Sequence, residues 1–356
     1  MSLRPLLELL ERSALAPVVE ASRGGALTGI ESMRAPVVAS IASAHDRPLL
    51  VITATRREAD AVRDDLAAWL PEAQVLDLPA WETLPHERLS PSAETVGRRG
   101  ATLRAVAERQ PGTPMVIVAS VRAALQPVAD NLLSVDPVEL VAGARGIDLA
   151  ALSRRLVDLA YARVDMVTRR GEFAVRGGIV DVFAPAEDYP VRIELFGDEV
   201  DQMRWFHVAD QRSDAEPIDR VVLPPSREML LTEAVRSRAR QLAPEFPGIQ
   251  QMLERIGEGI PVEGMESLAP ALLPRLVPIT HYLPDAGVVV LGPERIRVNC
   301  IEPGFVETEA TAVNDFDMPF VMTPDEAAGG RTGANPSASR ACASAPAASA
   351  ASPRAW

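Results

Sequence analysis

The segment Gly29–Pro36 comes nearest to a motif with known chemistry, the phosphate-binding loop. Such a loop reads GxxxxGK[ST], in which backbone amides and a lysine hold the phosphates and a hydroxyl holds magnesium. Gly29 keeps the first glycine, but Arg34, Ala35 and Pro36 replace the second glycine, the lysine and the hydroxyl. We therefore predict a degenerate nucleotide loop that has lost its nucleotide chemistry. An ordinary loop arginine is the simpler interpretation of Arg34.

The basic residues also limit the available chemistry. The chain has 36 lysine-plus-arginine residues, and all of them are arginine. This excludes a phosphate-loop lysine, a Schiff base and the Tyr/Lys pair of a dehydrogenase. The four histidines and two cysteines have no metal-ligand spacing. We therefore predict no metal, no cofactor and no enzymatic activity.

Charge and hydropathy restrict the partners and the compartment. The 49 acidic residues give a net charge of −13, which disfavours bulk DNA and anionic membranes and allows at most weak DNA binding. No apolar run approaches the roughly 18–20 residues of a membrane span. Two cysteines provide no disulfide framework, and the amphipathic amino terminus does not have the pattern of a signal peptide. We expect a cytoplasmic protein.

The secondary structure that must position any site is predicted to differ between the two halves of the chain. Residues 26 to about 145 alternate strand and helix patterns, which predicts an α/β fold with a parallel sheet. The expected strands are 26–30, 48–54, 74–78 and 115–119, and the expected helices are 55–70 and 94–109. An apolar run at 287–291 is expected to complete this sheet.

A different pattern follows the helix expected at 147–160. Short strands separated by Gly, Pro and Asp predict an antiparallel meander inserted into the α/β fold. These strands are expected at 163–167, 172–175, 178–183, 191–196 and 199–208, with helices at 227–242 and 249–256. At the carboxyl end, 21 of the 28 residues 329–356 are Ala, Ser, Gly or Pro, which predicts a disordered tail.

Four segments carry a resemblance to a known family: Leu49–Pro71, Leu78–Pro91, Arg169–Pro185 and Arg192–Phe206. Over residues 1 to about 295, the chain resembles the UvrB-like amino-terminal module of bacterial transcription-repair coupling factors. The resemblance implies a RecA/UvrB-like parallel sheet without ATPase activity and an inserted β-rich domain. In that family the inserted domain docks on UvrA, the damage sensor of nucleotide excision repair.

The resemblance also implies a division into domains. Residues 1–145 would form the degenerate P-loop domain, 146–210 the β-rich UvrA-binding domain, and 211–295 a helical segment completing the α/β domain. The family's UvrA-facing positions are matched by Arg163, Arg176, Arg192 and Glu194. Independently of the resemblance, residues 191–195 alternate apolar and charged, which places Arg192 and Glu194 on one face. A solvated sheet face is the alternative to an interface there.

A second resemblance begins near Arg295. Residues 296–328 resemble the carboxyl-terminal part of short-chain dehydrogenases through Asn299, Pro303, Gly304 and Thr308. In that family this loop lies against a nicotinamide cofactor. The Gly-rich turn and the Tyr-x-x-x-Lys pair of such enzymes are missing, so a remnant without function is favoured.

Three functional hypotheses remain open. The favoured one is a truncated coupling factor: a UvrA-docking module for transcription-coupled nucleotide excision repair. It would lack the RNA polymerase-binding and translocase domains, so no RNA polymerase binding is expected. The second is a non-functional truncated or fused gene product. The third is an enzyme, either an ATPase through residues 29–36 or a short-chain dehydrogenase through residues 299–308.

Overall fold

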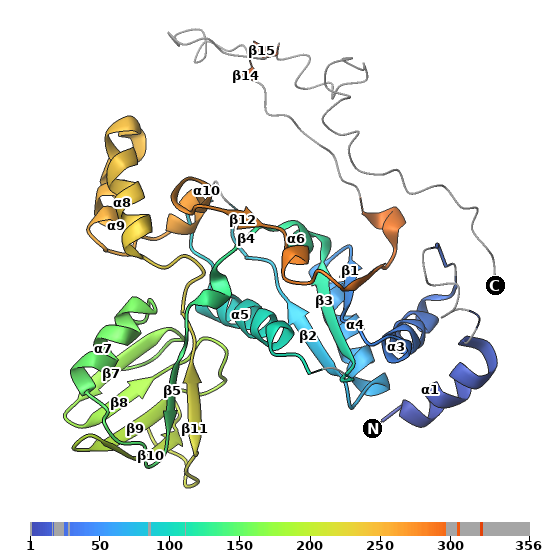
Figure 1. Ribbon diagram of the computed structural model, residues 1–356, viewed down its shortest axis with the longest axis horizontal. Helices are drawn as coiled ribbons and strands as arrows, with labels where there is room; N and C mark the ends of the chain where they lie inside the picture. The colour runs from blue at the N-terminus through green and yellow to red at the C-terminus, as the bar shows by residue number, and fades with distance from the viewer. Residues whose placement is uncertain are drawn as a thin grey trace. The chain divides into compact units, whose positions relative to one another are not determined.

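The computed structural model describes residues 2–15, 17, 25–27, 29–84, 87–110, 112–296, 305–306 and 321–322 (Figure 1). The chain divides into two compact units, Met1–Arg23 with Ile30–Pro293 and Gly24–Gly29 with Glu294–Trp356. In the second unit, β14 (Phe305–Val306) pairs in parallel with β15 (Val321–Met322). The predicted disordered tail and the dehydrogenase-like positions Asn299, Pro303, Gly304 and Thr308 lie outside the described residues.

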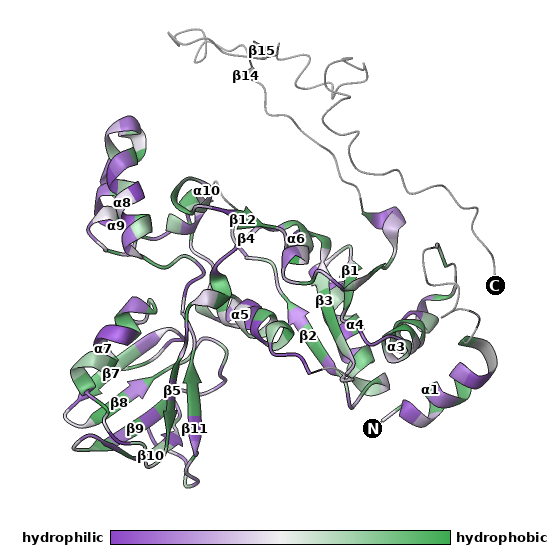
Figure 2. Ribbon diagram, viewed as in Figure 1, coloured by the Kyte–Doolittle hydropathy of each residue, from purple (hydrophilic) through white to green (hydrophobic). Residues whose placement is uncertain are grey.

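A four-stranded parallel sheet forms the first half of the larger unit. Its order is β13-β1-β3-β2, with bounds Gly287–Val290, Leu49–Thr53, Met115–Ser120 and Gln74–Leu78. Every residue of β3 is buried, as expected for a strand covered on both faces, and Figure 2 shows β3 in green. The predicted parallel sheet is confirmed. The apolar run near residue 287 does pair with β1.

Helices cover both faces of this sheet. They are α1 (Arg4–Leu10), α3 (Arg34–Ala44), α4 (Arg56–Trp69), α5 (Ala93–Ala107) and α6 (Val121–Leu125). Val51 and Val118 pack with α1, α3 and α4 on one face, while Leu50 and Ile117 pack with α5 on the other. Helix α4 begins where its sequence predicts, because the Thr55 hydroxyl accepts a hydrogen bond from the Glu58 amide.

The strand expected at residues 26–30 does not join the parallel sheet. Among the described residues of that segment, Leu27 alone carries a strand-type bridge. The segment has two large apolar residues, Leu27 and Ile30, and both are exposed. A strand of a parallel sheet needs apolar side chains on two buried faces, so this run is too weakly apolar to qualify.

The second sheet of the larger unit is β-rich, with five strands in the order β10-β9-β8-β7-β6. Their bounds are β6 (Ala162–Arg163), β7 (Glu172–Arg176), β8 (Ile179–Val182), β9 (Val191–Phe196) and β10 (Glu199–Trp205). The antiparallel meander is confirmed for β7–β10. It is wrong for the first strand, because β6 is two residues long and runs parallel to β7.

One face of the β-rich sheet packs against α7 (Leu149–Asp158). Phe173, Ile193 and Leu156 are completely buried in this core, and Phe183 is buried in a smaller neighbouring cluster. Asp148 caps α7 by accepting hydrogen bonds from two backbone amides, and these bonds lower the pKa of its carboxyl.

The remaining elements connect the two sheets or extend from them. Two antiparallel ribbons pair β5 (Val138–Val141) with β11 (Arg220–Leu223) and β4 (Val128–Ala129) with β12 (Leu276–Val277). Further helices are α8 (Glu233–Leu242), α9 (Gln250–Gly257) and α10 (Ala269–Leu272). Among the described residues, no helix is both long enough and apolar enough to cross a bilayer.

Short helical turns complete the described elements. A π-helical turn spans Glu11–Leu15. The 3-10 turns are Glu31–Met33, Leu132–Ser134, Ala243–Glu245, Pro247–Ile249, Met265–Leu268, Ile279–His281 and Pro293–Arg295.

Candidate protein interface

The face of the β-rich sheet opposite α7 carries polar side chains in ordered rows. Strand β9 alternates, so that Arg192 and Glu194 lie opposite the face that buries Val191 and Ile193. Cross-strand pairing extends two rows over this face. One row contains Ala174, Asp181, Arg192 and Arg204, and the next contains Arg176, Ile179, Glu194 and Gln202. We call these eight residues the polar face.

Asp181 is the centre of the polar face. Its side chain is only 1% exposed, and it accepts hydrogen bonds from two arginines on neighbouring strands. Arg192 donates through Nε at 2.7 Å and Nη2 at 3.0 Å, and Arg176 donates through Nη2 at 2.6 Å. Because one buried carboxylate fixes both guanidinium groups, their positions are set before any partner arrives.

Arg192 is held by further contacts besides Asp181. Its side chain is only 18% exposed, it lies 4.8 Å above the ring of Phe206, and it donates a further hydrogen bond to the Gln211 carbonyl. The hydrogen bond to Asp181 raises the pKa of Arg192. Arg192 is therefore largely buried on this face, whereas the side chain of Arg176 is 52% exposed.

Glu194 belongs to a second polar contact on the same face. Its Oε2 accepts a hydrogen bond from Gln202 at 3.0 Å, and the Gln202 carbonyl oxygen accepts one from Arg204 at 3.1 Å. Both partners lie on β10, and Arg204 also donates to backbone carbonyls beyond that strand. Gln202 thus orients the carboxylate of Glu194, while Glu194 itself remains partly exposed.

Arg163 does not join the polar face. It lies on the edge strand β6 and pairs in register with Phe173, whose side chain is buried in the α7-facing core. Directly paired residues of neighbouring strands project to the same side of a sheet, so Arg163 projects away from Asp181. It is exposed. The structure therefore brings Arg176, Arg192 and Glu194 together and leaves Arg163 apart.

The residues of the predicted degenerate nucleotide loop are divided between the two compact units. Arg34, Ala35 and Pro36 lie in the first turn of α3, where Ala35 and Pro36 are buried and Arg34 pairs with Glu31 at 2.9 Å. Gly29 belongs to the other compact unit. A buried proline removes an amide from the helix start, where a phosphate would need donors.

The carboxyl ends of the parallel strands, the usual ligand crevice of α/β sheets, have their hydroxyls engaged. Thr53 at the end of β1 donates to the Thr55 carbonyl at 2.9 Å. Ser120 at the end of β3 accepts from the Ala123 amide at 3.3 Å and caps α6. Among the described residues, no group of His, Cys, Asp or Glu is arranged to hold a metal ion.

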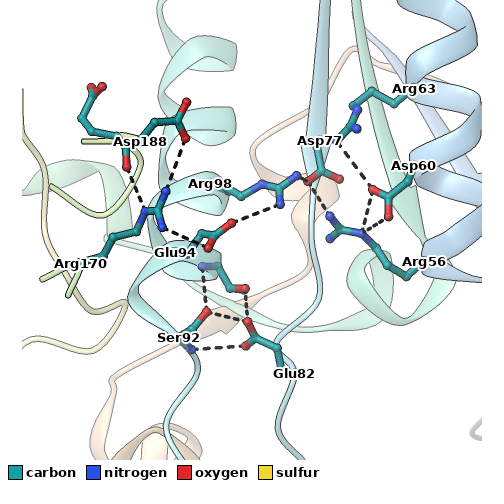
Figure 3. A network of polar contacts seen from close by, with 12 residues as sticks. Arg56, Asp60, Arg63, Asp77, Glu82, Ser92, Glu94, Arg98, Arg170 and Asp188 are labelled. Atoms are coloured by element: carbon teal, nitrogen blue, oxygen red, sulfur yellow. Dashed lines mark hydrogen bonds and ion pairs between the residues drawn. The ribbon is translucent and has the colours of Figure 1, made fainter. Parts of the chain in front are cut away.

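A chain of alternating charges runs from the parallel sheet to the β-rich sheet (Figure 3). Asp77 on β2 contacts Arg56 of α4 at 3.2 Å and Arg98 of α5 at 2.5 Å. Glu94, also on α5, lies 3.4 Å from Arg170, which precedes β7. These ion pairs join β2 to α4 and α5, and α5 to the segment that precedes β7.

A buried ion pair joins α5 to the segment that follows β11. Arg99 is completely buried and donates through Nε to Glu228 and through Nη1 to the Pro79 carbonyl at 2.8 Å. The indole nitrogen of Trp81 donates to the same Glu228 oxygen at 3.0 Å. This network holds Pro79 and Trp81, in the segment that follows β2.

Sequence reasoning missed Asp181 and Gln202 on the polar face. The run 179–183 reads as a buried strand, and the charge in its middle has the alternation that would have pointed to this face. Gln202 has no such signal, because a register shift between Val200 and Gln202 decides which β10 residues share the face with Arg192.

Comparison with known proteins finds a family that matches the part of the chain containing the polar face. Residues 138–229 match the family described as the UvrB interaction domain. That range begins at β5, ends just beyond β11 and contains the whole β-rich sheet and its polar face. The match therefore covers the site described above.

Longer alignments identify relatives that are described as transcription-repair-coupling factors. One from Mycobacterium tuberculosis is 44% identical over 319 residues, which cover 84% of this chain and 26% of the relative. One from Myxococcus xanthus is 34% identical, covering 72% and 22%. One from Escherichia coli is 28% identical, covering 75% and 23%. The chain spans about a quarter of the length of these relatives.

Proposed function

We propose that this chain is a UvrA-docking module of the transcription-repair-coupling type, acting in transcription-coupled nucleotide excision repair. The observation that carries the proposal is the polar face, which lies wholly inside the residues that match the UvrB interaction domain. Arg176, Arg192 and Glu194 are the contact residues in this proposal. Arg163 would contribute from the sheet edge, apart from the other three.

The polar face has properties suited to a protein partner. Arginine is enriched in protein interfaces, and charge-assisted hydrogen bonds to a partner carboxylate are strong and directional. Arg176 has half of its side chain available for such a bond while Asp181 holds its guanidinium. Preorganised side chains lose less entropy on binding, which favours affinity.

The proposed role is binding without catalysis. The positions of the degenerate loop offer no lysine and no magnesium hydroxyl, and phosphoryl transfer depends on both types of stabilisation. The RNA polymerase-binding and translocase functions of coupling factors are not assigned to this chain. The domain boundaries 1–145, 146–210 and 211–295 are part of the proposal.

The direct test is titration of purified UvrA against the full chain, followed by variants of the polar face. Arg176→Ala is the cleaner probe, because its half-exposed side chain contributes little to folding. We expect at least a tenfold loss of affinity, about 1.4 kcal/mol. Arg192→Ala should also weaken binding, but circular dichroism must show that this variant is folded.

Arg34→Ala is the matched control. It removes an arginine of similar charge from α3, within the same unit but outside the matched residues. Its UvrA affinity should equal that of the parent chain. If the parent chain fails to bind UvrA, the proposed function is wrong. If it binds and folded Arg176→Ala and Arg192→Ala bind equally well, the polar face is the wrong surface.

A further inference from the structure

Phe196 is the most conspicuous apolar side chain on the surface of the β-rich sheet. It is 80% exposed and takes no part in the described hydrophobic cores. It ends β9, two residues after Glu194, so alternation places it on the side of the sheet that carries the polar face. Phe173 and Phe183, by contrast, are buried.

Its exposure is not the result of a loose loop. Phe196 pairs with Glu199 across the β9–β10 hairpin, and Gly197 takes the left-handed conformation, φ +66°, that the tight turn needs. The amides of Gly146 and Ile147 donate to the Asp198 side chain and carbonyl at 3.2 and 2.9 Å.

Two further hydrogen bonds fix the start of β10. The Gly143 amide donates to the Val200 carbonyl at 2.8 Å, and the Val200 amide donates to the Ala144 carbonyl at 2.9 Å. Backbone bonds therefore hold the hairpin from the side of residues 143–147, while the ring of Phe196 projects into solvent. An aromatic ring on such a support offers large contact area at a small entropic cost.

We propose that Phe196 is the apolar anchor of the docking face, inserted into an apolar pocket of the partner protein. This inference rests on the proposed function, in which the partner is UvrA. Binding energy in interfaces concentrates in a few aromatic and arginine residues surrounded by polar groups. Phe196 beside Glu194, with Arg176 two strands away in the same row as Glu194, has that composition.

The chemistry of the partner surface follows from this arrangement. It needs an apolar pocket for one phenyl ring, a carboxylate for Arg176, and a hydrogen-bond donor or cation for Glu194. The phenyl ring supplies the largest apolar area available on this part of the face. Arg176 and Glu194 then fix orientation and exclude wrong partners, which is the usual role of charges around an anchor.

The experiment measures UvrA binding to the full chain by isothermal titration, comparing the parent with Phe196→Ala, Phe196→Leu and Phe246→Ala. Phe246 is the matched control, because it is a 49% exposed phenylalanine between α8 and α9, outside the residues that match the UvrB interaction domain. We expect Phe196→Ala to bind at least tenfold more weakly, Phe196→Leu to recover part of the loss, and Phe246→Ala to bind like the parent.

The outcomes separate this inference from the proposed function. All three phenylalanine variants should keep the parent's thermal midpoint, since both side chains lie largely outside the cores. If the parent and Phe196→Ala bind UvrA equally well, the anchor is refuted and the docking function stands. If Phe246→Ala loses as much affinity as Phe196→Ala, a specific anchor is also refuted. If the parent does not bind UvrA, both proposals fail.

Discussion

Replacing Asp181 with asparagine should destabilise the β-rich sheet without leaving a cavity. The substitution keeps the size of the side chain but removes the negative charge with which both Arg176 and Arg192 form ion pairs. The amide also presents N–H groups toward guanidinium donors, so at least one of the three hydrogen bonds in this cluster is lost. The perturbation therefore acts on the polar face and leaves the apolar core intact.

The magnitude follows from the exposure of the two arginines. Arg176 is half exposed, so its pair with Asp181 is screened by solvent and contributes at most about 1 kcal/mol. Arg192 is largely buried, and hydrogen bonds to charged groups contribute about 1.5–3 kcal/mol each. Removing the buried carboxylate also relieves its desolvation penalty. We therefore expect a net loss of about 2–3 kcal/mol.

Hydrogen exchange of the β8 and β9 amides, followed by mass spectrometry, measures this loss locally. A change of 2–3 kcal/mol corresponds to about 30- to 150-fold faster exchange where exchange requires opening of the sheet. Arg176→Ala serves as the control and should change exchange by less than about fivefold. If Asp181→Asn exchanges within threefold of the parent, the buried carboxylate does not hold the polar face and the reasoning fails.

Two other predictions concern the rest of the larger unit. Glu228→Ala should lower the free energy of unfolding by about 3–5 kcal/mol, because it strands the buried guanidinium of Arg99; urea denaturation with less than about 1 kcal/mol of change would contradict this. Burial raises the pKa of Glu187, and the neighbouring carboxylate adds to the shift. A raised pKa in the folded state means that the ionised form is unfavourable there, so the destabilising contribution of Glu187 should disappear as pH falls through the carboxyl range. Glu187→Gln should therefore melt higher than the parent at pH 7, with the difference shrinking toward pH 4.5; a constant difference across that range would argue against the assignment.

The parallel sheet was predictable because burial on both faces leaves a direct signature. Strands β1 and β3 are runs of Leu, Val and Ile, and no other element type explains two such short runs between helices. The β5–β11 ribbon was not predictable in the same way. Its strands are four residues long and about 80 residues apart, so neither the pattern of one strand nor the length of a turn indicates the pairing.

In the candidate site, too, features set by the local sequence pattern were predictable, whereas features set by strand register were not. The alternation along β9 placed Arg192 and Glu194 on one face, because a two-residue period is a local property. The position of Arg163 depends on the parallel pairing of β6 with β7, and a shift of one residue would turn it to the other face. Grouping Arg163 with Arg192 from the sequence alone therefore had no physical basis in the strand pattern.

The structure of the polar face also changes what a binding defect would mean. Because Arg192 is nearly buried and stacks on Phe206, its loss removes both a possible contact and part of the support of the face. Arg176 shares the same carboxylate but has half of its side chain in solvent, so its loss chiefly removes a contact. Both variants should lose affinity for the partner, and only Arg192→Ala should show faster exchange of the β8 amides. That result would show that Arg176 acts in recognition and that Arg192 also supports the polar face. Equal exchange in the two variants would instead show that Arg192 acts mainly through the partner.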